Sequence, residues 1–200
     1  MSTATRIPRA EAVEIANRFI GLLEGAYERL EIAGSIRRRL PTVGDLEIVA
    51  VPRLIVTEER DMFGEVIGSE PVDLLAARMT LLLDKGRVQQ RARSDGKFFW
   101  GPSAKYLTFE GASIDLFTPE ADRFAWILAL RTGPADFSNA LVTHQGMRTR
   151  TGRKGLLPDI YRSRDGWLTW RTSGERIVTR EEKRLFEILS LPWQEPWERV

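Results

Sequence analysis

The chain contains no cysteine and a single histidine, His144, among its 200 residues. Without cysteine there is no disulfide bond and no thiolate chemistry, and a lone histidine cannot build a zinc site. The longest apolar run, 124–130, is far too short to cross a bilayer, and the N-terminal residues lack the apolar core of a secretory signal. We therefore expect a cytoplasmic protein (in a host cytoplasm if the chain is viral) that is neither secreted nor bound to membranes.

Neither sign of charge is in large excess, since 30 basic residues oppose 28 acidic ones and the formal net charge is +2. This balance gives only a weak indication of a polyanionic partner. Local clusters are more informative, because residues 37–39 are three arginines and 148–154 carries four cations with no acid. A hydrophobic content of 42% and a charged content of 29% indicate a globular protein.

Hydrophobic periodicity predicts the elements of the first part of the chain. Apolar residues recur at helical spacing over 8–30, and 71–86 reads as a helix with proline near its start and glycine past its end. The segment 45–52 alternates and then becomes apolar, which predicts a strand buried on at least one face. The polar connection 53–70 shows no clear period, and two strands are expected around Glu110-Gly111.

The later part of the chain has a different pattern. Two helices are expected over 120–133 and 134–146, separated by a Gly-Pro pair. A hairpin is expected at Asp165-Gly166. The last helix is expected to begin with a capping box formed by Thr179 and Glu182.

These elements predict an α+β fold. We expect a mixed β-sheet with flanking helices over 1–118, and a smaller, mainly helical subdomain with a short β-hairpin over 119–200. No internal repeat or low-complexity segment interrupts the sequence.

Three acidic residues fall in the predicted sheet. Asp45 and Glu47 alternate along one strand and therefore share a face, and Asp115 lies between Ile114 and Leu116 in another strand. For Asp45 and Glu47 alone, an edge strand that faces water is an equally good interpretation. Asp115 changes this balance, because three carboxylates on neighbouring strands suit a hard divalent cation such as Mg²⁺.

The segment before these acids carries the opposite charge. Gly34 and Ser35 open a turn whose backbone N–H groups and hydroxyl could hold phosphate, and Arg37 and Arg38 follow at once. Cations for phosphate and acids for metal at one sheet edge are typical of a two-metal phosphoryl-transfer site. The separation of charge is explained if a metal–triphosphate complex lies between the two clusters.

Four short motifs occur in order along the chain: GSIRR at 34–38, GDLEI at 44–48, SIDLF at 113–117 and RTGPADFSN at 131–139. In this order and spacing they resemble the nucleotidyltransferase core of the family X DNA polymerases. The resemblance covers nearly the whole chain, including the opening helix and the C-terminal helix with its proline-containing tail. It implies a nucleotidyltransferase palm followed by a nucleotide- and template-binding subdomain.

The resemblance also implies roles for particular side chains. The catalytic carboxylates, which would ligate two Mg²⁺ ions with Mn²⁺ as a possible substitute, would be Asp45, Glu47 and Asp115. The triphosphate of the incoming nucleotide would be bound by Gly34, Ser35 and Arg38. The sugar and base pocket would be formed by Leu130, Arg131, Thr132, Gly133, Ser138 and Asn139. The cations that would contact the DNA backbone, or else lie in a solvated loop, are Arg148, Arg150, Arg153 and Lys154.

Three features depart from the family pattern. Glu47 stands where the family usually has aspartate, which favours a displaced strand, a slow site or a preference for the more forgiving Mn²⁺. Leu130-Arg131 replaces an aromatic pair, so the preference between deoxy- and ribonucleotides is not predicted. No separate lyase or DNA-grip domain precedes the first motif, and we expect no lyase activity.

The function implied by the resemblance is that of a DNA-directed DNA polymerase, which extends a primer 3′-hydroxyl and releases pyrophosphate. The partners would be primer–template or gapped DNA and a deoxynucleoside triphosphate, and the protein would act as a monomer in DNA repair or replication. Two alternatives stay open: a template-independent terminal nucleotidyltransferase, and a catalytically weak module that binds nucleic acid or nucleotides.

An aromatic run, Phe98-Phe99-Trp100, is followed by glycine. Such a cluster can stack a nucleobase, as aromatic residues do in single-strand binding proteins, or it can belong to a half-buried hairpin. The sequence favours the hairpin without excluding the stacking role.

Overall fold

The structure is a computed structural model that describes residues 6–93 and 95–199. Its centre is a five-stranded sheet with the strand order β2-β4-β9-β8-β7. The pair β4–β9 is parallel and the other pairs are antiparallel, so the sheet is mixed. The strands are β2 (Tyr27–Ile32), β4 (Leu46–Pro52), β9 (Ala112–Phe117), β8 (Ala104–Phe109) and β7 (Gln89–Gln90). The mixed α+β class predicted from the sequence is confirmed.

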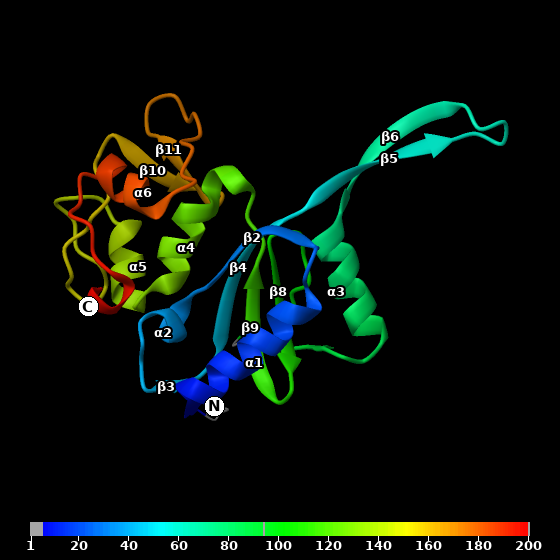
Figure 1. The fold of residues 1–200 in the computed structure, drawn as a ribbon. Coiled ribbons are helices and arrows are strands. Elements are labelled where there is room, and N and C mark those ends of the chain that lie inside the picture. The colour runs from blue at the N-terminus through cyan, green and yellow to red at the C-terminus, as the bar shows by residue number, and fades with distance from the viewer. Residues whose placement is uncertain (1–5, 94, 200) are drawn as a thin grey trace.

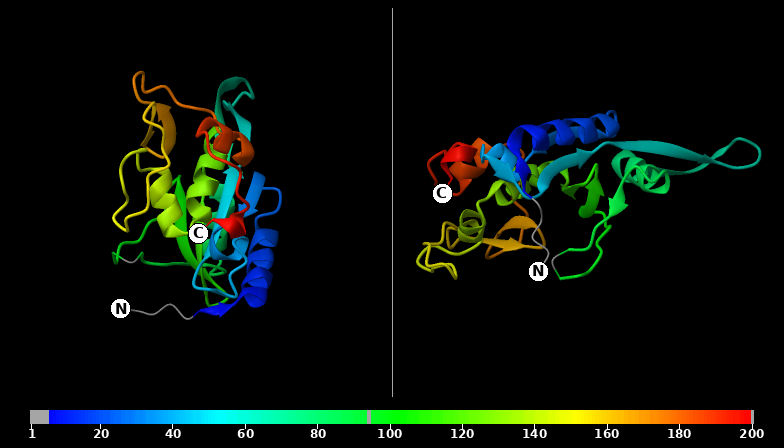
Figure 2. Two further views of the ribbon diagram at one scale, coloured as in Figure 1. Left: turned by 90° about the vertical axis from the view of Figure 1, so that its left-hand side faces the viewer. Right: turned by 90° about the horizontal axis from the view of Figure 1, so that it is seen from below.

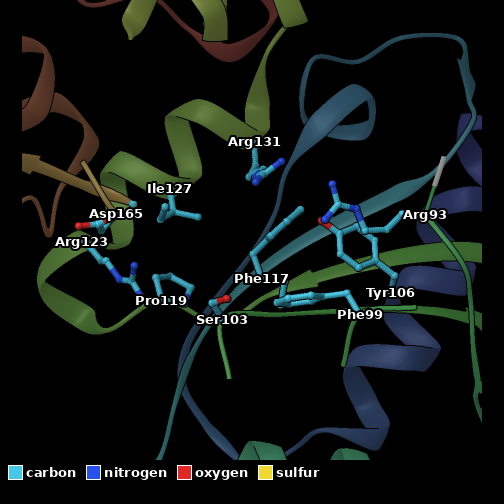
Figure 3. Close-up of a pocket in the computed structure, with 12 residues that line it drawn as sticks. Arg93, Phe99, Ser103, Tyr106, Phe117, Pro119, Arg123, Ile127, Arg131 and Asp165 are labelled. Atoms are coloured by element: carbon cyan, nitrogen blue, oxygen red, sulfur yellow. The ribbon is translucent and has the colours of Figure 1, made fainter. Parts of the chain in front are cut away.

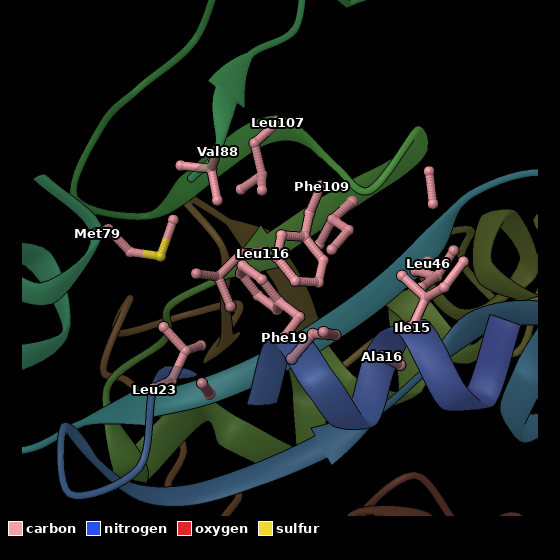
Figure 4. Packing of buried hydrophobic residues seen from close by; sticks show 14 of the residues in the cluster. Ile15, Ala16, Phe19, Leu23, Leu46, Met79, Val88, Leu107, Phe109 and Leu116 are labelled. Atoms are coloured by element: carbon pink, nitrogen blue, oxygen red, sulfur yellow. The ribbon is translucent and has the colours of Figure 1, made fainter. Parts of the chain in front are cut away.

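One face of the sheet is covered by two helices, α1 (Arg9–Leu22) and α3 (Leu74–Asp84) (Figure 1). Side chains alternate along each strand, and those on this face form the main hydrophobic core with both helices (Figure 4). The rings of Phe19 and Phe109 lie 5.5 Å apart in this core, and Leu116 beside them is fully buried. Burial of each such side chain stabilises the fold by about 1.5–3 kcal/mol relative to exposure.

The other face of the sheet receives helix α4 (Phe124–Thr132), which packs on it through Leu128 against Phe117. The elements after the sheet share a second core around Trp126 and Phe186. Figure 1 shows this C-terminal part to the left of the sheet. Its other elements are η1 (Ala121–Arg123), α5 (Ala135–Leu141), β10 (Tyr161–Arg164), β11 (Trp167–Trp170), α6 (Glu182–Ile188) and η2 (Pro196–Glu198).

A long hairpin of β5 (Leu54–Arg60) and β6 (Val66–Asp73) projects away from the sheet (Figures 1 and 2). The prediction of an irregular connection here is therefore wrong. Every residue of β5 is exposed, so neither face carries the apolar alternation by which a strand is predicted from sequence. At the tip, the Asp61 carboxylate accepts hydrogen bonds from the N–H groups of Phe63 and Glu65, both at 2.9 Å.

The helix predicted over 8–30 is too long. α1 ends at Leu22, Gly25 has a φ of +80°, and β2 begins at Tyr27 and pairs with β4. A left-handed φ at Gly25 lets the chain reverse without the cost that a Cβ would add. Pairing with β4 therefore determines the conformation of residues whose spacing alone also fits a helix.

The last helix also begins later than predicted. α6 begins at Glu182 with Glu181 at the N-cap position, so the capping box expected from Thr179 and Glu182 is wrong. The Thr179 hydroxyl lies 3.4 Å from the Asp122 carbonyl oxygen instead. The Glu182 carboxylate forms ion pairs that are described below.

The short elements β1 (Ile7–Pro8) and β3 (Thr42–Val43) pair with each other, and α2 (Gly34–Arg37) lies between β2 and β3. The strand predicted over 45–52 is confirmed by β4, and the hairpin predicted at Asp165-Gly166 is confirmed by β10 and β11. No helix in the described part of the chain combines the length and the apolar character that crossing a bilayer requires.

Candidate functional site

A row of three side chains crosses the sheet on the face opposite α1 and α3. Glu47 of β4 is paired in register with Asp115 of β9, and Asp115 is paired with Tyr106 of β8. Neighbouring strands lie about 4.8 Å apart, so these side chains are adjacent on their common face. Asp45 directly precedes β4 and is exposed. The strand pairing therefore places the predicted acids of two distant motifs side by side.

The acids of the row carry more negative charge than the nearby cations offset, and they are partly buried. Burial, together with the charges of Asp45 and Asp115, raises the pKa of Glu47 to about 8. Burial also raises the pKa of Asp115 to about 6, although the Arg91 guanidinium opposes this rise. A carboxyl that resists ionisation at neutral pH lacks sufficient positive charge around it, and a bound cation would supply that charge.

Asp115 has one partner that the sequence did not indicate. The Arg91 guanidinium, just beyond edge strand β7, forms an ion pair with the Asp115 carboxylate and lies 5.7 Å from the centre of the Tyr106 ring. The two paired residues are 24 positions apart, so no local pattern reveals the contact. Within the described residues, the buried Nε of Arg91 has no hydrogen-bond partner.

Among the residues that the structure describes, no three histidine, aspartate or glutamate side chains already converge where a metal ion could sit. Asp115 is held by Arg91, and Asp45 is exposed. The donor chemistry fits Mg²⁺ or Mn²⁺, because three carboxylates supply hard oxygen ligands in a region of excess negative charge. For Asp115 to bind an ion, its carboxylate must leave Arg91.

The first residue of α2, Gly34, lies very close to this row. Gly34 has a φ of +60°, and a Cβ at this position would lie 2.2 Å from a carboxylate oxygen of Glu47. The left-handed backbone conformation therefore favours glycine here, and the missing side chain leaves room for the Glu47 carboxylate. The next side chain, Ser35, has a buried hydroxyl with no hydrogen-bond partner among the described residues. An unpaired buried hydroxyl is costly unless a ligand such as a phosphate oxygen completes its hydrogen bonding.

Arg38 connects the row to the end of α4. Its guanidinium donates to the carbonyl oxygen of Thr132. Burial lowers the pKa of Arg38, while the charges of Glu47 and Asp45 oppose this effect. A Cβ on Gly133 would lie 2.6 Å from Arg38 Nη1, so the glycine leaves room for the guanidinium. Arg38 is thus the cation of the GSIRR motif that faces the acids.

Among the residues predicted for the sugar and base pocket, Arg131 acts electrostatically on the acids. Its positive charge opposes the rise in the pKa values of Glu47 and Asp115. The guanidinium stacks over the ring of Phe117, 3.9 Å from its centre. Arg131 therefore contributes a positive charge close to the acids of the row.

The other predicted pocket residues have mixed surroundings. Thr132 is buried, and its hydroxyl donates to the Leu128 carbonyl oxygen at 2.7 Å. Ser138 donates to the Leu130 carbonyl oxygen, also at 2.7 Å, while Asn139 is exposed. The two hydroxyls are thus engaged by backbone, and Asn139 has its side chain at the surface.

The four cations predicted to contact the DNA backbone also differ in their exposure to solvent. Arg148, Arg150 and Lys154 are exposed. Arg153 is half-buried, with its guanidinium 4.0 Å from the Asp136 carboxylate. Three of the four cations are therefore available at the surface for a polyanion.

The structure contains a buried ion-pair cluster that no sequence motif predicted. Glu182 accepts from Arg37 at 2.6 Å and from Arg199 at 2.7 Å, and the Arg199 side chain is 0% exposed. Burial alone would raise the pKa of Glu182, but hydrogen bonds and charges from both arginines outweigh it and lower the pKa. Arg37, which follows the expected phosphate-binding turn in the sequence, thus links α2 to the C-terminal part. Separations of 145 and 17 residues explain why no motif revealed this cluster.

No protein-family model matches the chain, and no curated protein is detectably similar to it. Function must therefore be inferred from the residues themselves.

Proposed function

We propose that this protein is a nucleotidyltransferase of the family X DNA polymerase type, with a palm formed by the sheet. The observation that carries the proposal is the pairing of Glu47 with Asp115 beside the turn that holds Ser35 and Arg38. Acids lie on one side of this site, and an unpaired hydroxyl and a guanidinium lie on the other. Such an arrangement suits a substrate that combines divalent cations with a polyphosphate.

In the reaction we propose, a 3′-hydroxyl oxygen of a nucleic acid attacks the α-phosphorus of a nucleoside triphosphate. A new P–O bond forms, the bond from the α-phosphorus to the bridging oxygen breaks, pyrophosphate leaves, and the hydroxyl proton passes to water. Two Mg²⁺ ions, or Mn²⁺, held by Asp45, Glu47 and Asp115 would offset the triphosphate charge and favour the ionised hydroxyl.

The residues of the chain itself act by binding and orientation. The Ser35 hydroxyl and the Arg38 guanidinium would bind the terminal phosphates, for which a charged donor is stronger than a neutral one. Arg131 would bring a further positive charge to the acids from α4. Its guanidinium lies over the ring of Phe117, which favours this orientation.

The acceptor that we propose is DNA, as primer–template or gapped duplex, with a deoxynucleoside triphosphate as donor and the protein acting as a monomer. The exposed cations Arg148, Arg150 and Lys154 could contact phosphates of such an acceptor.

The test is extension of a labelled primer, offered alone, on a template and at a one-nucleotide gap, with each dNTP and NTP and with Mg²⁺ or Mn²⁺. Template-matched addition supports the proposal. Indiscriminate addition would support a template-independent terminal transferase instead. Binding without extension under every condition would leave only a nucleic-acid-binding module.

The matched controls are Asp115→Asn, which removes one carboxylate charge of the row, and Glu187→Gln, which removes an exposed carboxylate of α6. Extension by the Glu187→Gln variant but not by the Asp115→Asn variant would assign the activity to this site. Equal extension by both variants would show that a contaminant or another site is responsible.

A further inference from the structure

A cavity of about 290 Å³ lies between the sheet and α4, next to the acidic row (Figure 3). Its volume is near the lower end of the range for small-molecule sites, which is about 300–1,000 Å³. The side chains that give it its chemistry are Phe99, Tyr106, Phe117, Arg93, Arg123 and Arg131. Aromatic rings and guanidinium groups together line the cavity, which is a composition suited to a nucleotide.

The aromatic side chains form a continuous wall. The rings of Phe99 and Tyr106 are 6.2 Å apart and edge-on, and those of Tyr106 and Phe117 are 6.3 Å apart and perpendicular. Phe117 is 4% exposed, whereas Phe99 is 37% exposed at the open side of the cavity. Phe99 belongs to the aromatic run for which both a hairpin and a stacking role were open. The Phe99 ring lies against Tyr106, and part of its surface is exposed to water, so a base could stack on it.

The cations of the cavity have unused binding capacity. The Arg93 guanidinium lies 5.5 Å from the centre of the Tyr106 ring. The Nε of Arg123 is buried and has no hydrogen-bond partner within the described residues. Among the described residues that line the cavity, Asp165 carries a carboxylate and three arginines carry guanidinium groups. Arg93 and Arg123 each also have an acid 3.8 Å away, Asp95 and Glu120, so the cavity offers guanidinium donors to an anionic group such as a phosphodiester without a large net positive charge.

The cavity is joined to the acidic row through Tyr106. Tyr106 pairs directly with Asp115 across β8 and β9, and such side chains have Cβ atoms about 5 Å apart. A base stacked on Tyr106 would therefore place its sugar beside Asp115. The Ser35 and Arg38 side of the site lies beyond Glu47, at the other end of the row. The two ends of the row thus offer separate places for a donor triphosphate and for an acceptor.

We propose that this cavity binds the 3′-terminal nucleoside of the acceptor strand, with its base stacked on Phe99 and Tyr106. The inference rests on the proposed function for the identity of the acceptor, and it adds residues that the family resemblance does not assign. Stacking on aromatic rings tolerates any base, so the cavity selects a strand end rather than a sequence.

The test uses the whole protein and single-stranded oligonucleotides that carry 2-aminopurine either at the 3′ end or four positions inside, without metal ion or triphosphate. Stacking on an aromatic ring should quench the terminal probe and leave the internal probe bright. Parallel deoxyribose and ribose oligonucleotides establish which sugar the cavity accepts, since the stacking chemistry is common to both.

Phe99→Leu and Tyr106→Leu should each weaken binding of the strand by about tenfold and remove the terminal quenching. The matched control is Phe98→Leu, because Phe98 is 64% exposed and does not line the cavity. Tyr106→Phe keeps the ring and should keep the quenching. Phe99 lies at the surface, so its variant stays informative even if the Tyr106→Leu protein fails to fold.

Equal quenching at both probe positions would overturn the inference, as would terminal quenching that survives both Leu substitutions. Quenching of 2-aminopurine riboside triphosphate alone, with no effect on strand ends, would also overturn it and assign the cavity to the donor. Terminal quenching in a protein that never extends a primer would support the cavity and reject the proposed function. Extension without terminal quenching would reject the cavity and leave the proposed function standing.

Discussion

Within the described residues, we compare two regions that hold acids at least partly withdrawn from water, because the surroundings of these acids are opposite. Glu182 is held between Arg37 and Arg199, so two cations surround one acid and its pKa is lowered. Glu47 and Asp115 lie side by side with too little positive charge, and their pKa values are raised to about 8 and about 6. Both regions bury charge, but only the first satisfies it within the chain.

This difference separates a structural ion-pair cluster from the site that we propose to be functional. A buried acid with complete partners resists removal because its arginines would be left without a counter-charge. Adjacent acids without enough cations weaken the folded state, and this cost is typical of a site that completes itself with a ligand. Arg37 and Arg38 are neighbours in one motif, yet Arg37 serves the first region and Arg38 faces the second.

The largest effect is expected at the Glu182 cluster. Glu182→Gln leaves Arg37 and Arg199 buried without an anion and should lower the free energy of unfolding by about 3–5 kcal/mol. Urea denaturation followed by circular dichroism measures the loss. Glu187→Gln is the control, because its pair with Arg184 is exposed and should contribute less than about 1 kcal/mol. Equal losses in the two variants would show that the cluster is not a structural centre.

In the acidic row, a substitution should lower activity and leave stability nearly unchanged. Asp115→Asn should lower the rate of nucleotidyl transfer at least a hundredfold, since loss of even an outer-shell partner of a metal costs about 10- to 100-fold. The free energy of unfolding should change by less than about 1 kcal/mol, because relief of the repulsion between Asp115 and Glu47 offsets the loss of the ion pair with the partly exposed Arg91. Single-turnover extension and urea denaturation on the same preparation measure both effects. A large loss of stability with full activity would reverse the assignment of the two regions.

The two arginines of the GSIRR motif sharpen the comparison further. Arg38→Ala should raise the apparent KM for the nucleotide about tenfold, because a charged hydrogen bond to phosphate is lost. Arg37→Ala should lower stability and leave the KM of the folded protein nearly unchanged. Steady-state kinetics below the unfolding transition distinguish the two variants. If Arg37→Ala raised the KM and Arg38→Ala did not, the phosphate-binding role would belong to Arg37.

The pH dependence of stability, measured with a chelator present, tests both regions in one experiment. The lowered pKa of Glu182 means that its contribution is complete above pH 4.5 and is lost as pH falls through the lowered value. The raised pKa of Glu47 has the opposite sign, so stability should fall as pH rises from about 5 to 8. Glu182→Gln should flatten the acid limb, and Glu47→Gln should flatten the limb near neutral pH. Unchanged limbs would contradict the electrostatics of both regions.

Sequence patterns predicted the parts of the fold that depend on local periodicity. β4 was predicted from its apolar run, and the strands around Glu110-Gly111 from their alternation of apolar and polar residues. The acids of these strands were predicted to share a face, and the pairing of Glu47 with Asp115 brings two of them together. The β5–β6 hairpin was missed because both of its faces are exposed and no burial pattern marks it. The end of α1 was placed too late because pairing with β4 determines the structure of residues after Gly25.

The contacts that complete the two charged regions could not be predicted. Arg91 reaches Asp115 from a strand edge 24 residues away, and Arg37 reaches Glu182 across 145 residues. Each pair depends on how distant elements pack, which no spacing in the sequence records. The resemblance predicted a phosphate-binding role for Arg38 and did not predict that Arg37 would pair with Glu182, because that pair depends on how α2 packs against the C-terminal part.

Mn²⁺ binding to the protein, followed by the loss of the free-ion signal in electron paramagnetic resonance, tests most directly whether the acidic row is a site for a cation. The wild-type protein and the Glu187→Gln variant should bind Mn²⁺ equally, and Asp115→Asn should weaken that binding at least about tenfold. Failure of the wild-type protein to bind, or equal binding by the Asp115→Asn variant, would contradict the account.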